Sequence, residues 1–304
     1  MWTLFSRIEL PGEFVLPSLA ELETLAKRFG LREKVIAKLP EWYGLPYDWE
    51  VMGDLVLRLM RVEERQAAAE EIIAKTAGLA PNGQAQILVG LVALHYLEIC
   101  YERVGLEDEV AFDCLRRLGQ LLGNYMSLHK RIGFSQFIWF SKFMSGLLVR
   151  LGTLFYEIRP LSAELAARPG LAHLREGDIC LFIHISEDAH LDDEHLDASL
   201  RWQADFFPEA GLEPRAVLCR TWLLDPRLGH FLRLDSGLRR FARRFDIVQV
   251  EDIPRSRYAY WVFKLPGNTE LPLEKWPTET SLQRGIREHF LAGGVLGSAT
   301  GILR

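Results

Sequence analysis

The sequence lacks the features that mark disulfide-rich, membrane-spanning or secreted proteins. Only four cysteines occur in 304 residues, widely spaced and without a Cys-x-x-Cys pair, so we expect buried, reduced thiols in a cytosolic protein. The most apolar stretch, "FSQFIWFSKFMSGLLVRLGTLF", is interrupted by Lys142 and Arg150, which argues against a membrane-spanning helix and a membrane partner. The amino-terminal residues lack a basic segment followed by an apolar one, so no secretory signal is expected.

An excess of basic charge is also missing. The formal net charge is −5, so nothing in the overall charge favours nucleic acid or an anionic membrane as a partner. The chain contains no P-loop, no Gly-x-Ser-x-Gly elbow and no Rossmann glycine pattern, which leaves nucleotide hydrolases, serine hydrolases and classical dehydrogenases without support. A hydrophobic content of 49% is sufficient for a real core, and the length predicts about two domains.

The first half of the sequence has the pattern of helices. Ser18 and Glu21 form a capping box, in which each side chain satisfies an unpaired backbone amide of the other residue. Apolar residues then recur at helical spacing up to Gly30, which is a typical helix stop. We predict an all-helical domain over residues 1–150. Its expected helices cover residues 18–30, 32–39, 50–76, 84–104 and 108–122.

From residue 151 the pattern changes to strands alternating with helices. The segments rich in β-branched and aromatic residues are "LFYEI", "ICLFIHI", "RAVLCRTWLL", "DIVQV" and "YAYWVF". Helices are expected over residues 192–207, 236–245 and 281–292. The last two strands are joined by a short polar loop, which predicts an antiparallel pair. The fold class is therefore mixed α/β (α+β), with a mixed-sheet domain over residues 151–304.

Histidines and acids crowd the segment "CLFIHISEDAHLDDEH", which raises the question of a metal site. Asp192 is positioned as a helix N-cap, and the acids after it stabilise the first turn of the helix. His190 and His195 lie on either side of the helix start rather than at i and i+4 of one face, so we expect no metal. His184 ends a buried strand, where it is either a core residue with satisfied hydrogen bonds or a catalytic residue.

Several strings of the second half resemble a known family. They are "LFIHIS", "LDDEHLDASLRWQADFFPE", "CRTWLLDPRLGHFLRLDSGLRRFARRF" and "TSLQRGIREHFLAGG", with Cys219 to Pro226 as the most specific part. They resemble the GNAT-like C-terminal domain of a bacterial acyltransferase family, in which a helical N-terminal domain comes first. The resemblance implies the GNAT fold and an acyl-coenzyme A (acyl-CoA) cosubstrate, possibly acetyl-CoA. The acceptor would be a small-molecule or peptide amine, and the enzyme would be cytoplasmic.

The glycine-rich pyrophosphate loop of GNAT enzymes, Arg/Gln-x-x-Gly-x-Gly/Ala, has no match here. After the strand "RAVLCRTWLL", Asp225 and Pro226 place a carboxylate and a missing amide at a helix start, which disfavours a phosphate there. We therefore consider arginine side chains as phosphate ligands, since a guanidinium bonds two oxygens together. The candidates lie on one predicted helix and are Arg239, Arg240, Arg243 and Arg244. The alternative is that these arginines form an ordinary solvated face.

Acyl transfer to an amine needs a base and, for the leaving thiolate, an acid. Candidate bases are Glu157 and His184, and candidate acids are Tyr258 and Tyr260, each of which could instead be an ordinary residue of the sheet. Cys219 is a possible covalent nucleophile, although a buried core position suits its apolar surroundings better. The leading hypothesis is an acyl-CoA-dependent N-acyltransferase. The alternative is a non-catalytic binding or regulatory module that has lost the pyrophosphate loop.

Overall fold

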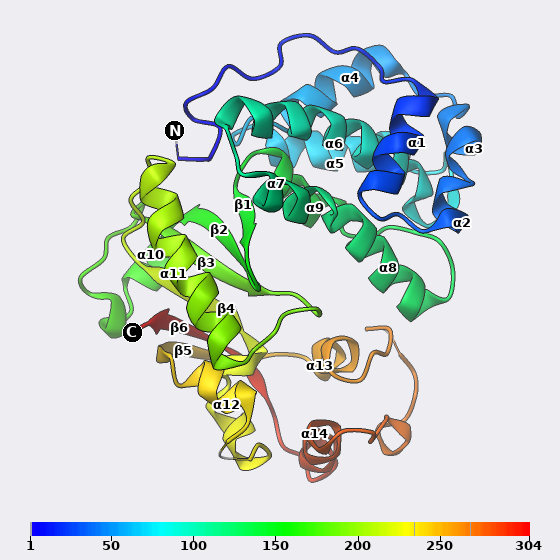
Figure 1. Ribbon diagram of the computed structural model, residues 1–304. Coiled ribbons are helices and arrows are strands. Elements are labelled where there is room, and N and C mark those ends of the chain that lie inside the picture. The colour runs from blue at the N-terminus through cyan, green and yellow to red at the C-terminus, as the bar shows by residue number, and fades with distance from the viewer. Residues whose placement is uncertain (1, 234, 268) are drawn as a thin grey trace. The chain divides into compact units, whose positions relative to one another are not determined.

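The computed structural model describes residues 2–233, 235–267 and 269–304, and the chain divides into two compact units (Figure 1). The first unit is Met1–Arg150 and the second is Leu151–Arg304. The boundary falls within a short strand, β1 (Leu148–Leu151).

The first unit is helical, as its sequence pattern predicts. Its helices are α1 (Leu19–Arg28), α2 (Glu33–Ile36), α3 (Leu39–Tyr43), α4 (Trp49–Arg58), α5 (Arg65–Thr76), α6 (Gln84–Val104), α7 (Asp108–Leu115), α8 (Arg117–His129) and α9 (Phe137–Met144). The predicted capping box starts α1, with the Ser18 amide donating to Glu21 Oε2 at 2.7 Å. The apolar helix α6 is buried along most of its length, so it is the central element of this unit.

Two of the predicted long helices are each a pair of shorter ones. The segment predicted as one helix over residues 50–76 forms α4 and α5, and residues 108–122 are divided between α7 and α8. The chain turns after α4, where Leu59 and Met60 are buried. A turn that buries apolar side chains carries no glycine or proline signal, so the sequence pattern did not reveal it.

The second unit contains a mixed sheet. Its further strands are β2 (Leu154–Pro160), β3 (Ile179–Ile185), β4 (Val217–Thr221), β5 (Phe245–Asp252) and β6 (Gly297–Leu303), and the six-stranded sheet has the order β1-β2-β3-β4-β6-β5. Its helices are α10 (Ala163–Ala166), α11 (Asp193–Glu209), α12 (Gly237–Ala242), α13 (Arg255–Trp261) and α14 (Ser281–Leu291). Only β3 and β4 of the registered pairs run parallel, while β2–β3, β4–β6 and β5–β6 are antiparallel.

The parallel pair β3–β4 parts at its carboxyl end. The registered pairs are Leu181–Val217, Phe182–Leu218 and Ile183–Cys219, and each strand continues for two residues beyond the last pair. His184 and Ile185 stay paired with β2, whereas Arg220 and Thr221 stay paired with β6. Beyond Ile183 and Cys219, β3 and β4 are therefore no longer registered as partners of each other. We call this opening the β3–β4 fork.

One predicted strand was wrong. "YAYWVF" begins within helix α13, and its predicted antiparallel partner, β5, pairs with β6 instead. Tyr258 and Ala259 are adjacent and both fully buried in one apolar cluster with Ile286 and Phe290. The packing of this cluster therefore overrides the β-propensity of the aromatic residues.

Strand β6 was not predicted. Its sequence, Gly-Ser-Ala-Thr-Gly-Ile-Leu, begins with small residues that have little β-propensity. These residues suit their position between two neighbouring strands. A Cβ added at Gly297 would lie 2.1 Å from the Glu251 carbonyl oxygen, and one added at Gly301 would lie 2.8 Å from Phe245 Cβ. None of the helices in the described part of the chain is sufficiently long and apolar to cross a membrane.

Candidate active site

A carboxylate and an imidazole form the central pair of the candidate site. His184 Nε2 lies 2.6 Å from Glu157 Oε2. The β2–β3 register places Phe155 opposite His184 and Glu157 opposite Phe182, so the two polar side chains share one face of the sheet. Glu157 is only 3% exposed, whereas the His184 side chain is 32% exposed. The buried carboxylate therefore orients an imidazole that solvent or a ligand can reach.

The opposite face of these strands is covered by helix α11, seen across the sheet in Figure 1. The hydroxyl groups of Tyr156 and Ser199 form a hydrogen bond of 3.0 Å, and Ser199 donates to the Leu151 carbonyl oxygen at 2.5 Å. The Tyr156 ring also packs edge-on against Phe207. Because Tyr156 and Glu157 are neighbours on one strand, this packing fixes the strand that carries the catalytic carboxylate candidate.

Ser186 is a polar residue at the fork and was not among the predicted site residues. It follows β3 directly and is 9% exposed, and its Oγ has no hydrogen-bond partner among the described residues. A buried hydroxyl without a partner is destabilising and is rare in native proteins. The loop that Ser186 begins is held in place by Thr153, whose Oγ1 accepts a hydrogen bond from the His190 amide at 2.6 Å.

The helix that follows β3 begins with acids, as predicted. Asp192 caps α11 by accepting from the His195 amide at 3.1 Å. Hydrogen bonding from the His195 side chain lowers the pKa of Asp192 to about 2, so this carboxylate stays charged. A helix N-terminus beside a sheet opening favours anions, but here the protein's own carboxylates occupy it.

The predicted arginine cluster lies beside these acids. Arg240, on α12, forms an ion pair with Asp193 at 3.0 Å. Arg244, which lies between α12 and β5, pairs with Asp193 at 2.8 Å and also with Asp197. Arg239 donates to the Leu232 carbonyl oxygen, while Arg243 is exposed. The arginines therefore stand at the start of the helix that follows β3, but two of the four already bind carboxylates.

The two tyrosine candidates lie on α13 rather than on a strand. Tyr258 is fully buried in the apolar cluster with Trp276 and Phe290, and its hydroxyl donates to the Gly297 carbonyl oxygen at 2.8 Å. Burial raises the pKa of Tyr258, which keeps its phenol protonated. Tyr260 is half-buried on the same helix. The structure thus brings Glu157 and His184 into contact, whereas Tyr258 is buried in a separate apolar cluster.

Cys219 has the surroundings of a core residue. It is fully buried on β4, and its thiol donates to the Ile183 carbonyl oxygen at 3.6 Å. Burial raises the pKa of the Cys219 thiol, so the nucleophilic thiolate is disfavoured. All four cysteines are free and buried. A covalent acyl-cysteine route has no support from this geometry.

Asp225 has a larger structural role than its sequence context predicted. It caps a 3₁₀ helix (Pro226–His230) by accepting from the Arg227 amide at 3.0 Å, which confirms the predicted cap. In addition, its Oδ2 accepts from the Gly297 amide at 2.5 Å, which ties the segment after β4 to the start of β6. The helix that follows the parallel strand β3 is α11, so the helix start relevant to a ligand in the fork is at Asp192 rather than at Asp225.

No group of three or more histidine, cysteine, aspartate or glutamate residues with metal-binding geometry occurs within residues 2–233, 235–267 and 269–304. His190 and His195 stack on each other with ring centroids 4.8 Å apart. The His195 Nδ1 atom is engaged with Asp192 at 2.8 Å. His190, His195 and Asp192 therefore belong to the capped start of helix α11.

A helical unit followed by a mixed sheet with a forked central parallel pair is the architecture of a two-domain GNAT-like protein. Comparison with protein families agrees: the N-acyltransferase N-terminal domain matches residues 20–146, and the GNAT-like C-terminal domain matches residues 148–303. The chain belongs to this family, which confirms the resemblance and the fold class derived from the sequence. No protein of curated function matches the chain by sequence.

Solved structures of acyltransferases share this fold. An acyltransferase in complex with decanoyl-CoA has 22% sequence identity and a TM-score of 0.74, over 97% of this chain and 90% of that one. An acyltransferase mutant in complex with octanoyl-CoA has 21% identity and a TM-score of 0.76, over 99% and 93% of the two chains. A third structure, with decanoyl-CoA and teicoplanin, has 23% identity and a TM-score of 0.64, over 93% and 98%.

Proposed function

We propose that the chain is an acyl-CoA-dependent N-acyltransferase in which the pair Glu157–His184 is the general base. The observation that carries this proposal is the 2.6 Å contact between a buried carboxylate and an accessible imidazole at the carboxyl end of the forked central strands. Family membership supports it, because the matched domains are described as N-acyltransferase and GNAT-like. The relatives bound to decanoyl-CoA and octanoyl-CoA favour a medium-chain acyl donor over acetyl-CoA.

The proposed reaction follows from the geometry of this pair. Glu157, when ionised, accepts a hydrogen bond from Nε2–H of His184, which leaves Nδ1 as the ring nitrogen that takes a proton. An ammonium acceptor has a pKa of about 10, so it must lose a proton before it attacks. The free amine then attacks the thioester carbonyl carbon, the C–N bond forms, and the C–S bond breaks. The imidazolium returns a proton to the leaving thiolate, and the acylated nitrogen releases its extra proton to water, which gives a neutral amide and coenzyme A (CoA).

The proposal is tested by thioester cleavage. Purified protein is incubated with acetyl-, octanoyl- or decanoyl-CoA and a panel of amines, and release of the free CoA thiol is followed spectroscopically. We expect amine-dependent release that is faster with the longer acyl chains. Tight acyl-CoA binding without release under any amine would instead support a binding module that retains the fold, and absence of both would overturn the acyltransferase assignment.

We also propose that Ser186 donates a hydrogen bond to a carbonyl oxygen of bound acyl-CoA. Ser186→Ala should weaken acyl-CoA binding about 2- to 10-fold, the range of one neutral hydrogen bond, while leaving the stability of the free protein unchanged or higher. Calorimetric titration and thermal unfolding measure the two quantities. Ser256→Ala, at an exposed position on α13, is the control and should alter neither. A loss of stability in Ser186→Ala with unaltered binding would make Ser186 a structural residue.

The arginines on α12 and directly after it remain the proposed ligands of the CoA phosphates. Because Asp193 holds both Arg240 and Arg244, a phosphate must compete with this carboxylate for the same guanidinium groups. We expect Arg240→Ala with Arg244→Ala to weaken acyl-CoA binding at least tenfold. Asp193→Asn should strengthen it several-fold, since it releases Arg240 from Asp193, leaves Arg244 with Asp197 alone, and removes a repulsive charge. Equal affinities in wild type and both variants would leave the cluster as a surface ion-pair network.

A further inference from the structure

The face of the sheet that carries Glu157 and His184 also carries an arginine, Arg159. It lies two residues after Glu157 on β2, so both side chains leave the same face, and the register places Arg159 opposite Cys180. The Arg159 guanidinium carbon lies 3.5 Å from the centroid of the Phe182 ring, and Phe182 is the residue opposite Glu157. Arg159 therefore leans along the sheet toward Glu157, which His184 contacts from the carboxyl end of β3.

The hydrogen-bond donors of Arg159 are not used by the described part of the chain. Its guanidinium forms neither a hydrogen bond nor an ion pair with residues 2–233, 235–267 or 269–304, although the side chain is half-buried. Stacking on Phe182 uses the face of the guanidinium, whereas its N–H groups lie in the plane. Burial lowers the pKa of Arg159, but an arginine remains charged in a protein. A half-buried guanidinium with unused donors in its plane suits a planar anion.

The neighbouring charges on this face do not pair with Arg159. Glu157 attracts it electrostatically, but the Glu157 carboxylate is bound to the imidazole of the candidate base. Arg220 lies two residues beyond the β4 partner of Phe182, so it shares the face, and its ion pair is with Glu251. The charge of Arg220 also repels Arg159. Of these two arginines, Arg159 is therefore the one without an ion pair among the described residues.

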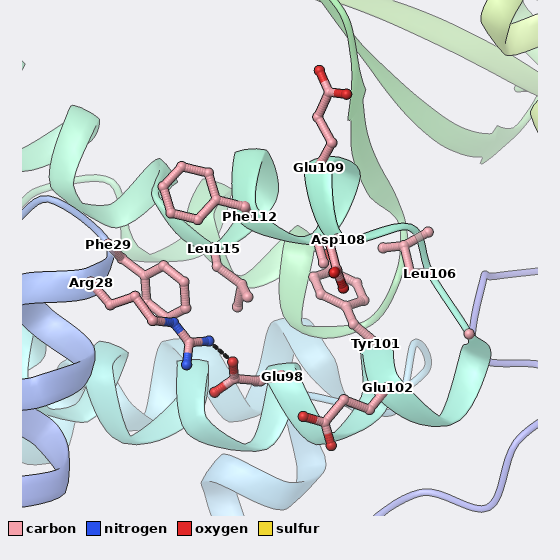
Figure 2. A pocket seen from close by; sticks show the side chains of 12 residues that line it. Arg28, Phe29, Glu98, Tyr101, Glu102, Leu106, Asp108, Glu109, Phe112 and Leu115 are labelled. Carbon is pink, nitrogen blue, oxygen red and sulfur yellow. Dashed lines mark ion pairs between the residues drawn. The ribbon is translucent and has the colours of Figure 1, made fainter.

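A stacked arginine of the helical unit shows a contrasting arrangement. Arg28 lies over the Phe29 ring, with its guanidinium carbon 4.5 Å from the ring centroid. The same guanidinium is paired with Glu98, as the dashed line in Figure 2 shows. Arg159 lies closer to its own ring, and no carboxylate of the described residues has the role beside it that Glu98 has beside Arg28.

The proposed phosphate ligands belong to the other face of the sheet. Helix α11 packs against that face, where Tyr156 and Ser199 form their hydrogen bond, and Arg240 is paired at the start of α11. Arg159 leaves the strand next to Glu157 and not next to α11. Its anionic ligand is therefore distinct from the CoA phosphates.

We propose that Arg159 binds the carboxylate of the acceptor, so that the acceptor is a short amino acid, with a primary amine and a carboxylate a few bonds apart. This inference rests on the proposed function, because it assigns the acceptor of the pair Glu157–His184. Positions on one face repeat about every 7 Å along a strand, so an amine at His184 and a carboxylate above Phe182 are separated by the length of such a molecule. The two carboxylate oxygens would accept from two N–H groups of the guanidinium.

The test compares acceptors that differ only in the carboxylate. Leucine with leucinamide, and 4-aminobutyrate with 4-aminobutyramide, are acylated from octanoyl-CoA by wild type and by Arg159→Gln. Each acceptor is compared with itself between the two proteins, so differences in intrinsic nucleophilicity cancel. We expect Arg159→Gln to lower kcat/KM about 10- to 100-fold for at least one of the carboxylate-bearing amines, and far less for its amide. Arg159→Lys keeps the charge without the planar fork and should give an intermediate loss.

Arg220→Gln is the control for the loss of a positive charge from this face. Arg220 is exposed and already paired with Glu251, so we expect kcat/KM to stay within about twofold for every acceptor. Thermal unfolding of each variant separates loss of function from loss of fold. An equal loss for carboxylate and amide in Arg159→Gln would show that Arg159 acts through the charge of Glu157, which would overturn the proposal. An equal loss in Arg220→Gln would also overturn it.

Binding is measured separately from acyl transfer. Ligand-observed NMR titrations compare N-acetylleucine with N-acetylleucinamide and 4-acetamidobutyrate with 4-acetamidobutyramide, which mimic acylated products. We expect at least one carboxylate to bind tenfold more tightly than its amide and to lose this advantage in Arg159→Gln. Such binding without acyl transfer to any amine would overturn the proposed function and retain the carboxylate site. Acyl transfer with no advantage for a carboxylate in either measurement would overturn the inference and retain the proposed function.

Discussion

His184→Ala is expected to lower kcat/KM for amine acylation by a factor of about 10²–10⁴, the usual contribution of a positioned general base. Some loss of stability is also expected, because the substitution leaves the buried Glu157 carboxylate without its imidazole partner, so thermal unfolding is measured beside the kinetics. His195→Ala is the matched control. This histidine lies in the same segment but binds Asp192 at the start of α11, so its removal should leave kcat/KM within about twofold.

Glu157→Gln addresses the other half of the pair. The glutamine amide keeps the size of the side chain but supplies no negative charge to stabilise the imidazolium, and its NH₂ group can favour the wrong tautomer of His184. We therefore expect a loss similar to that of His184→Ala, and a double variant no worse than either single variant, since the two residues act as a unit. Additive losses would show that Glu157 and His184 act independently.

The pair itself shows what the sequence could and could not predict. Glu157 and His184 were each identified as candidate bases from their positions on predicted strands. Their contact depends on the β2–β3 register, in which Phe155 lies opposite His184. A shift of one residue would move one of the two side chains to the opposite face, and nothing local to either strand specifies that register. Residue type was therefore predictable, but the geometry was not.

Long-range packing explains the remaining differences. The capping signals at Ser18 and Asp192 are local, and both helix starts were predicted correctly. Helix α13 has an aromatic sequence typical of a strand, and it is helical because Tyr258 and Ala259 pack into one cluster with residues about 30 positions later. Ser186 has no sequence signal at all, since an unpaired hydroxyl is recognised only when its surroundings are known.

The contact between Asp225 and Gly297 leads to the largest expected effect on stability. Asp225 is 2% exposed and accepts hydrogen bonds from the Gly297 amide and from both the amide and Nε of Arg227. Asp225→Ala leaves the buried Gly297 amide without an acceptor and removes a buried partner of Arg227. We expect it to lower the free energy of unfolding by about 2–4 kcal/mol, below the full cost of breaking a buried ion pair because Arg227 is partly exposed.

Asp252→Ala separates the two causes of this loss. Asp252 also pairs with Arg227, at 2.8 Å, but its side chain is 66% exposed and does not bind the Gly297 amide. Its removal should cost less than about 1 kcal/mol, the usual limit for an exposed ion pair. Urea unfolding of wild type and both variants, followed by tryptophan fluorescence, measures the difference. If Asp252→Ala is as destabilising as Asp225→Ala, then the loss of stability comes from removing an ion-pair partner of Arg227. In that case the hydrogen bond between Asp225 and the Gly297 amide contributes little.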